Sequence, residues 1–262
     1  MIKKLFILSL SFFLISPVFS AAVPSPVSQW KMNVNTNTTN VIDSVGSNTG
    51  TAQQNTDQLD TTGKINGALT FNGSSDYINC GSDNSLRPTA AISIALWAYI
   101  DLTAIGANIV YMVNAGYFTG GVSMHLDNRG EPHGVASVRF IVQGTENNTG
   151  WIGADNNVST TGWYHIVGTY DKDLGGIEEA KLYINNVKVA TADFSETIGT
   201  PTSPLYIGSN WTPGSFWKGK LDDVRFYNIG LSADEVSLLY NGGDGTEDEN
   251  PAEAARRIIM VQ

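Results

Sequence analysis

The stretch Lys218-Gly219-Lys220-Leu221-Asp222-Asp223-Val224-Arg225-Phe226-Tyr227-Asn228 decides the class of fold. Apolar and polar residues alternate along it, and a period of two is typical of a β-strand with one buried face. In this pattern Asp222 shares a face with Val224 and Phe226. A carboxylate is therefore expected to point inward among apolar neighbours.

Similar segments recur along most of the chain, separated by Gly, Asn, Asp, Thr and Pro, whereas helix-length periodicity is almost absent. So many strands at this spacing predict an all-β fold with two packed antiparallel sheets, a sandwich. The strands are expected at residues 68–71, 76–80, 92–100, 108–113, 122–126, 135–143, 163–170, 180–184, 187–190, 205–207 and 220–227.

One short helix is expected near the C-terminus. Ser232-Ala233-Asp234-Glu235 fits a capping box, and Leu231 and Val236 stand where a hydrophobic staple would form. Asn241-Gly242-Gly243 supplies the stop.

The two ends of the chain differ from the part between them. Residues 1–20 have a basic start, an uncharged apolar run and small residues at Val18 and Ser20, which predicts a cleavable signal peptide and a secreted, periplasmic or cell-surface protein. Residues 21–243 are expected to form one domain. Residues 244–262 are acidic and then basic and apolar, and a disordered tail is expected there.

Charge narrows the range of partners. Without Lys3 and Lys4, 13 of the 15 basic residues face 25 acidic ones, a net charge of −12. This disfavours nucleic acid and anionic membranes as partners. No later stretch reaches the ~20 apolar residues of a transmembrane segment. Cys80 is the only cysteine, so no intramolecular disulfide can form.

Several segments, in this order, resemble the laminin-G-like jelly-roll domains of the concanavalin A-like lectin/glucanase superfamily. The resemblance covers about residues 27–243 and implies a concanavalin A-like jelly roll. That fold hosts lectins, adhesion modules, glycosidases and lyases, so it implies no single function. The segments are residues 43–50, 67–78, 92–99, 162–170, 182–189 and 218–228.

The catalytic pattern of the glycan-hydrolysing relatives is missing. These enzymes place two carboxylates at alternate positions of one strand, as in Glu-x-Asp-x-Glu, and no such run occurs here. No catalytic residue is therefore assigned. Arg139, His125 and Tyr111 could share a face as a lyase would require, but they match no lyase motif, and solvent-facing strand residues are the favoured interpretation.

A structural Ca²⁺ is predicted as the one cofactor. In relatives of this fold an Asp at the start of the closing strand often helps to bind calcium with oxygens of the N-terminal segment, which implies a role for Asp222. Asp43, Gly46 and Asn48 lie in a polar turn that could supply further oxygen ligands. The alternative is that Asp222 accepts backbone N–H bonds and that Asp43 opens an Asx turn.

The six tryptophans fall into two groups. Trp30, Trp97 and Trp163 lie in strand motifs and are expected to be packed. The other three lie near loops, where ligand contacts concentrate, and aromatic rings stack on sugars. The predicted ligand-binding residues are Trp151, Trp211, Trp217 and, more weakly, Arg139.

These observations favour an exported, non-catalytic module that binds carbohydrate or mediates adhesion, with a glycan or an extracellular protein as its partner. Two alternatives remain open: a glycan-active enzyme of the same fold, and a structural subunit of an extracellular assembly attached through residues 244–262. The sequence does not determine the oligomeric state.

Overall fold

The computed structural model describes residues 22–104, 106, 108–116, 120–129, 134–145, 149–153, 155, 157–210 and 212–247. The predicted signal peptide and most of the predicted tail lie outside these residues. Within the described part no helix is long and apolar enough to cross a membrane.

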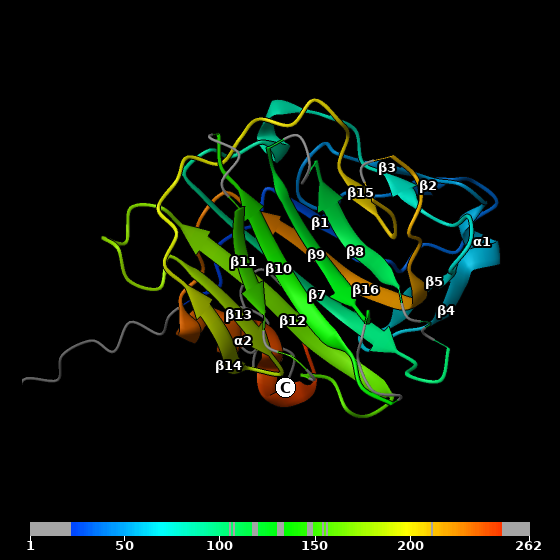
Figure 1. Ribbon diagram of the computed structural model, residues 1–262. Coiled ribbons are helices and arrows are strands. Elements are labelled where there is room, and N and C mark those ends of the chain that lie inside the picture. Colours follow the sequence, from blue (N-terminus) through cyan, green and yellow to red (C-terminus); the bar gives the residue numbers. More distant parts are fainter. Residues whose placement is uncertain are drawn as a thin grey trace, which may run out of the picture.

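The described residues form an all-β sandwich of two antiparallel sheets, as the sequence predicted (Figure 1). Sheet A has the order β14-β13-β12-β7-β16-β5-β4, with β1 also paired to β16, and sheet B has the order β11-β10-β9-β8-β15-β6-β3-β2. The strands are β1 (Ser28–Trp30), β2 (Asn40–Val41), β3 (Gly50–Ala52), β4 (Asp60–Thr62), β5 (Gly67–Asn72), β6 (Ile78–Asn79), β7 (Ala91–Ile100), β8 (Ile109–Ala115), β9 (Val122–Asp127), β10 (Ser137–Gln143), β11 (Thr149–Gly153), β12 (Gly162–Asp171), β13 (Ala180–Ile184), β14 (Val187–Ala192), β15 (Tyr206–Ile207) and β16 (Lys218–Tyr227).

The main core lies between the two sheets, because alternate residues of each strand point inward. On β7 these are Ile92, Ile94, Leu96, Ala98 and Ile100, all buried. The short helical elements are α1 (Thr56–Leu59), η1 (Asn84–Leu86), α2 (Ala233–Tyr240) and η3 (Asn241–Gly243).

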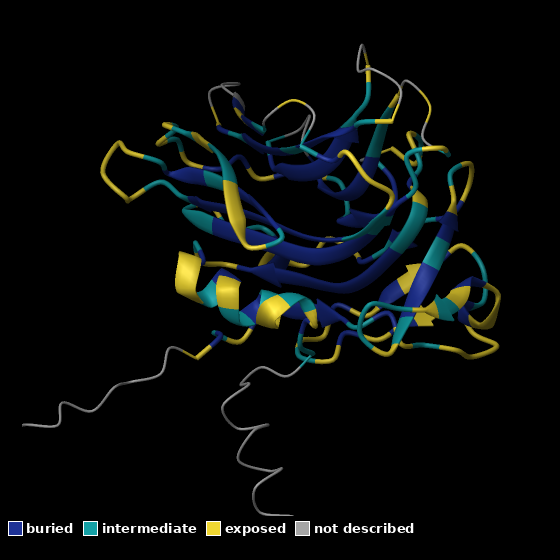
Figure 2. Ribbon diagram, turned by 90° about the horizontal axis from the view of Figure 1, so that it is seen from below, coloured by how far each residue is buried: buried dark blue, intermediate teal, exposed yellow. Residues whose placement is uncertain are grey.

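Helix α2 confirms the predicted capping box. The Ser232 hydroxyl accepts a hydrogen bond from the Glu235 N–H at 3.3 Å, and the Glu235 carboxylate accepts one from the Ser232 N–H at 2.7 Å. Leu231 and Val236 are buried in a second apolar cluster with Ala95 and Tyr227 of sheet A. The helix therefore covers the outer face of sheet A, and the outer face of sheet B lies on the opposite side of the sandwich (Figure 2).

Residues 244–247, which the sequence placed in the tail, are packed on sheet A. Asn33 donates to the Glu247 carboxylate at 2.7 Å, Gln29 donates to the Glu247 carbonyl at 3.2 Å, and Arg225 donates to the Thr246 carbonyl. The packed domain therefore continues past Gly243 to Glu247.

Candidate functional site

The outer face of sheet B brings together three residues that the sequence placed on different strands. Tyr111 of β8 and Arg139 of β10 are both cross-strand partners of His125 of β9. Directly paired residues point to the same face of a sheet, so the three side chains form one row. Arg139 is also the partner of Gly153 on the edge strand β11.

Trp151 completes this group. It lies on β11 opposite Ile141, and 49% of its surface is exposed. Its ring meets the His125 ring edge to face, with centroids 6.3 Å apart and an interplanar angle of 87°. Among the described residues of this face, Trp151 thus offers the large exposed aromatic surface.

Arg139 lies flat across the edge of the sheet. A Cβ atom at Gly153 would lie only 2.5 Å from its Cδ, so glycine at 153 leaves the space that the side chain occupies. The guanidinium forms an ion pair with Asp155, whose side chain is 72% exposed, whereas the Arg139 side chain is 19% exposed. Trp151, Arg139 and Asp155 therefore lie side by side at the β10–β11 edge.

His125 and Tyr111 are buried rather than solvent-facing, so the favoured interpretation of this row was wrong for both. Only 1% of His125 is exposed, and its ring lies 4.9 Å from the Tyr111 ring as well as next to Trp151. Its Nδ1 lies 3.3 Å from the Ser123 hydroxyl. Burial lowers the pKa of His125 to about 3, so the ring is neutral at physiological pH and cannot serve as a general acid there.

Trp217 was wrongly predicted to contact a ligand. It is fully buried in the core between the sheets, and its backbone N–H bonds to the Gly208 carbonyl at 2.9 Å. The turn residues before it made Trp217 look like part of a loop. Trp217 directly precedes β16, however, and its ring packs in the core. Trp211 lies outside the described residues. Trp30 and Trp97 are buried as predicted, and Trp163 is partly buried, with its ring edge to face on Tyr99 at 5.6 Å.

Three of the four predicted calcium ligands form a hydrogen-bonded turn. Asp43 Oδ1 accepts from the N–H groups of Gln29 at 3.0 Å, Val45 at 3.2 Å and Gly46 at 2.9 Å, and Oδ2 accepts from Asn48 N–H at 2.9 Å. Burial raises the pKa of Asp43, but these bonds outweigh it and hold the pKa below its usual value. A Cβ at position 46 would lie 2.4 Å from the Val27 carbonyl, so Gly46 permits a close approach of two chain segments.

Asp222 lies on the other face of β16 from the one predicted. It is the cross-strand partner of Trp97, and the register then shifts at a bulge where Asp223 has a φ of +45°. One extra residue reverses the alternation, so Val224 and Phe226 face the core while Asp222 faces outward. It is nevertheless fully buried, because residues 63–65 cover it and donate two N–H bonds of 2.8 Å to Oδ2.

The predicted calcium ligands therefore fall into two groups. Asp43 is bonded to the turn at residues 45–48, and Asp222 to the loop at residues 63–65, with no shared hydrogen-bond partner among the described residues. Nor does the described part contain a group of three or more His, Cys, Asp or Glu side chains that could hold a metal. These bonds match the alternative interpretation, in which Asp222 accepts backbone N–H groups and Asp43 opens a turn.

Calcium thus stays a prediction, and the melting temperature (Tm) tests it. A structural ion predicts a lower Tm in EDTA than in calcium, because an ion that binds only the folded state stabilises it. The same Tm in both conditions would exclude such an ion.

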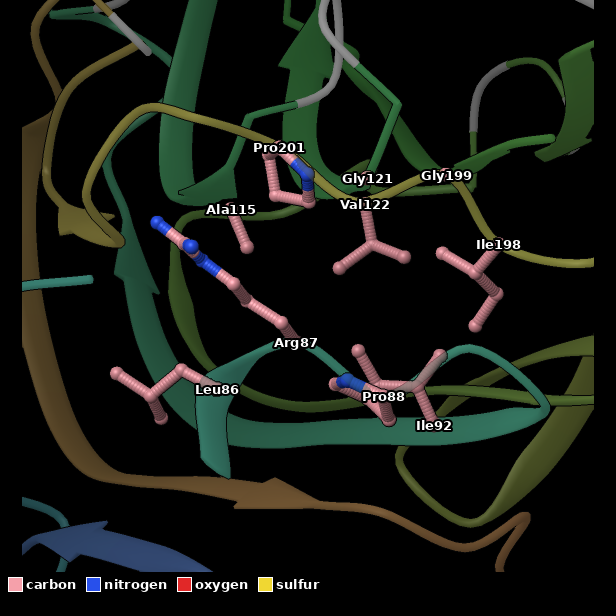
Figure 3. A pocket seen from close by; sticks show the side chains of 10 residues that line it. All are labelled: Leu86, Arg87, Pro88, Ile92, Ala115, Gly121, Val122, Ile198, Gly199 and Pro201. Carbon is pink, nitrogen blue, oxygen red and sulfur yellow. The ribbon is translucent and has the colours of Figure 1, made fainter. Parts of the chain in front are cut away.

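One small cavity lies at the rim of the sandwich, between the loop after η1 and the chain near Ile198 (Figure 3). Its room is sufficient for about one water molecule. The side chains of Leu86, Ile92, Val122 and Ile198 line it. This cavity is too small for a sugar ring, so the half-exposed Trp151 ring with the Arg139–Asp155 pair beside it is the better candidate site.

Comparison with known proteins identifies the fold. No curated protein sequence matches the chain. Among solved structures the chain is similar to the binding domain of botulinum neurotoxin serotype G (TM-score 0.61, 17% identity, 82% of this chain and 50% of that chain). It is also similar to the binding domain of Paraclostridial Mosquitocidal Protein 1 (TM-score 0.59, 16% identity, 83% and 52%). The chain spans about half the length of these toxin domains.

A third similar structure is domain 4 of AbnA, an extracellular GH43 arabinanase from Geobacillus stearothermophilus, solved with arabinotriose (TM-score 0.57, 19% identity, 86% of this chain and 100% of that chain). Identities this low show a shared fold. The family model of the concanavalin A-like lectin/glucanases superfamily, laminin-G type, matches residues 72–237, more than half of the sequence. The chain therefore belongs to the laminin-G-like family of the concanavalin A-like lectin/glucanase superfamily.

Proposed function

We propose that this protein is an exported, non-catalytic module that binds carbohydrate on the outer face of sheet B, around Trp151. The observation that carries the proposal is the half-exposed Trp151 ring beside the Arg139–Asp155 pair. An indole presents an apolar surface to a sugar ring, and the neighbouring charged groups can bond its hydroxyls. Export rests on the sequence of residues 1–20.

The chemistry of the face supports binding rather than catalysis. Its two described carboxylates, Asp127 and Asp155, are each paired with an arginine. Glycoside hydrolysis needs one protonated and one ionised carboxyl on either side of the bond, and the hydrogen bonds from Arg129 lower the pKa of Asp127 and favour its ionised form. The neutral, buried His125 offers no substitute acid.

The structural neighbours support the same function. Two are named as binding domains, and the arabinanase domain was solved with a bound oligosaccharide. A carbohydrate or an extracellular glycoconjugate is therefore the partner that we propose for this chain.

Replacing Trp151 with alanine is expected to weaken glycan binding at least about tenfold, because the variant loses the stacking surface. A glycan array on residues 21–262 would identify a ligand, and titration calorimetry would compare the variants. Ile177→Ala is the matched control, since Ile177 is 73% exposed in the loop between β12 and β13 of sheet A. Its affinity should equal that of the wild type.

Two results would contradict the proposal. One is equal affinity of the Trp151→Ala and Ile177→Ala variants. The other is release of reducing or unsaturated sugars from a polysaccharide panel, which would show that the protein is an enzyme.

A further inference from the structure

We infer that the ligand of the Trp151 face is a neutral glycan, because no described cation on this face is left without a carboxylate partner. The inference rests on the proposed function and adds the chemical class of the ligand. It depends on the basic residues of sheet B and on the groups that neutralise them.

Basic residues are scarce on this sheet. Arg139 is the one Lys or Arg within the strands of sheet B, and Arg129 follows β9 directly. The internal loop residues that the structure leaves undescribed contain no Lys or Arg but include Glu131 and Glu146. These residues therefore add no permanent positive charge to the chain.

Both arginines are already paired. Arg129 binds Asp127 through two parallel bonds, from Nε to Oδ1 at 3.0 Å and from Nη2 to Oδ2 at 2.9 Å. This two-point geometry is the one in which an arginine would otherwise bind a ligand carboxylate or sulfate. Arg139 donates through Nη2 to Asp155. An acidic sugar would have to compete with an aspartate for either arginine.

His125, the described histidine of this face, adds no positive charge to it. Burial holds the pKa of His125 at about 3, so the ring stays neutral at any pH where the protein would meet its ligand. The whole chain carries a formal net charge of −10, which repels polyanions further. Hydroxyl groups face no such barrier, because they can donate to Asp155 and accept from Arg139 at the same time.

The test compares neutral with uronate-containing and sulfated polysaccharides on the wild type and on Asp155→Asn. The wild type should bind neutral chains only, with an affinity that is unchanged between 50 and 500 mM salt, because salt does not screen hydrogen bonds to neutral hydroxyl groups as it screens charge pairs. Asp155→Asn should gain up to about fivefold in affinity for acidic chains at low salt, since it frees the Arg139 guanidinium.

Asp173→Asn is the matched control. Asp173 is also paired with a cation, Lys172, at 2.6 Å, and its side chain is 69% exposed, close to the 72% of Asp155. It follows β12 of sheet A and causes the same change in net charge. This variant should bind acidic chains no better than the wild type, because the freed cation lies away from Trp151.

Salt-sensitive binding of acidic glycans by the wild type would overturn this inference while leaving carbohydrate binding intact. An equal gain in the Asp155→Asn and Asp173→Asn variants would also overturn it, since a general charge effect would then explain the gain. Absence of binding to every glycan class would instead overturn the proposed function itself.

Discussion

Replacing Asp223 with asparagine is expected to lower the free energy of unfolding by about 3–5 kcal/mol, because it removes one partner of a buried ion pair. Arg225 is 1% exposed and bonds Asp223 through Nε at 2.9 Å, with Nη2 also 2.9 Å from the carboxylate. The arginine would remain buried without its counter-charge. Asparagine also tolerates the positive φ at this bulge, so the backbone is not a second cause.

Thermal unfolding would show this as a drop in Tm of roughly 10 °C. Asp127→Asn is the control, because Asp127 pairs with Arg129, whose side chain is 60% exposed. Exposed pairs contribute about 1 kcal/mol or less. Equal losses in the two variants would show that burial of the Asp223–Arg225 pair has no energetic consequence.

Asp222→Asn is expected to raise the Tm at pH 8 by at least about 5 °C in EDTA, and to change it little at pH 4. Burial, opposed in part by the N–H bond from Ile65 and reinforced by the charge of Asp223, raises the pKa of Asp222 from 3.8 to about 8. A folded-state pKa above the unfolded one means that the neutral form stabilises the fold. This contribution is complete below pH 4 and is lost as the pH rises to about 8.

Asparagine resembles the neutral carboxyl group and can still accept the N–H bonds of Lys64 and Ile65, so it should remove this pH dependence. The measurement is Tm against pH between 4 and 8, a range in which Asp43, with its lowered pKa, stays mostly charged. A variant that is less stable than the wild type at pH 8 would show that Asp222 works as an anion. If that loss appears only with calcium present, the ion binds at Asp222.

The long strands could be predicted, and the predicted ranges also contain the two-residue strands β6 and β15. β7 and β12 run for ten residues each, and their alternation was visible along the sequence. β1 to β4 have two or three residues each, too few to show a period. β1 and β4 pair with the longer strands β16 and β5, whereas β2 and β3 pair with strands as short as themselves. β11 was missed for a related reason: its residues, Thr149–Gly153, contain two glycines and follow a polar loop.

The candidate site could be predicted only in part. The sequence singled out Trp151 and Arg139, and the register of β10 and β11 places them at one edge of sheet B. It gave no sign of Asp155, because nothing local marks a loop aspartate as the partner of Arg139, 16 residues away. The sequence also predicted that Trp217 would contact a ligand. Its burial depends on how the second sheet packs.

The sequence by itself determined the all-β class, the order of the longer strands along the chain and the capped helix α2. Periodicity and caps are local properties that neighbouring residues create. Only the tertiary structure decided which way Asp222 points. One bulge at Asp223 reverses the faces of β16, and the loop that buries Asp222 comes from residues 63–65, about 158 positions away along the chain. Burial, charge pairing and access to ligand all depend on such distant contacts, which no local pattern encodes.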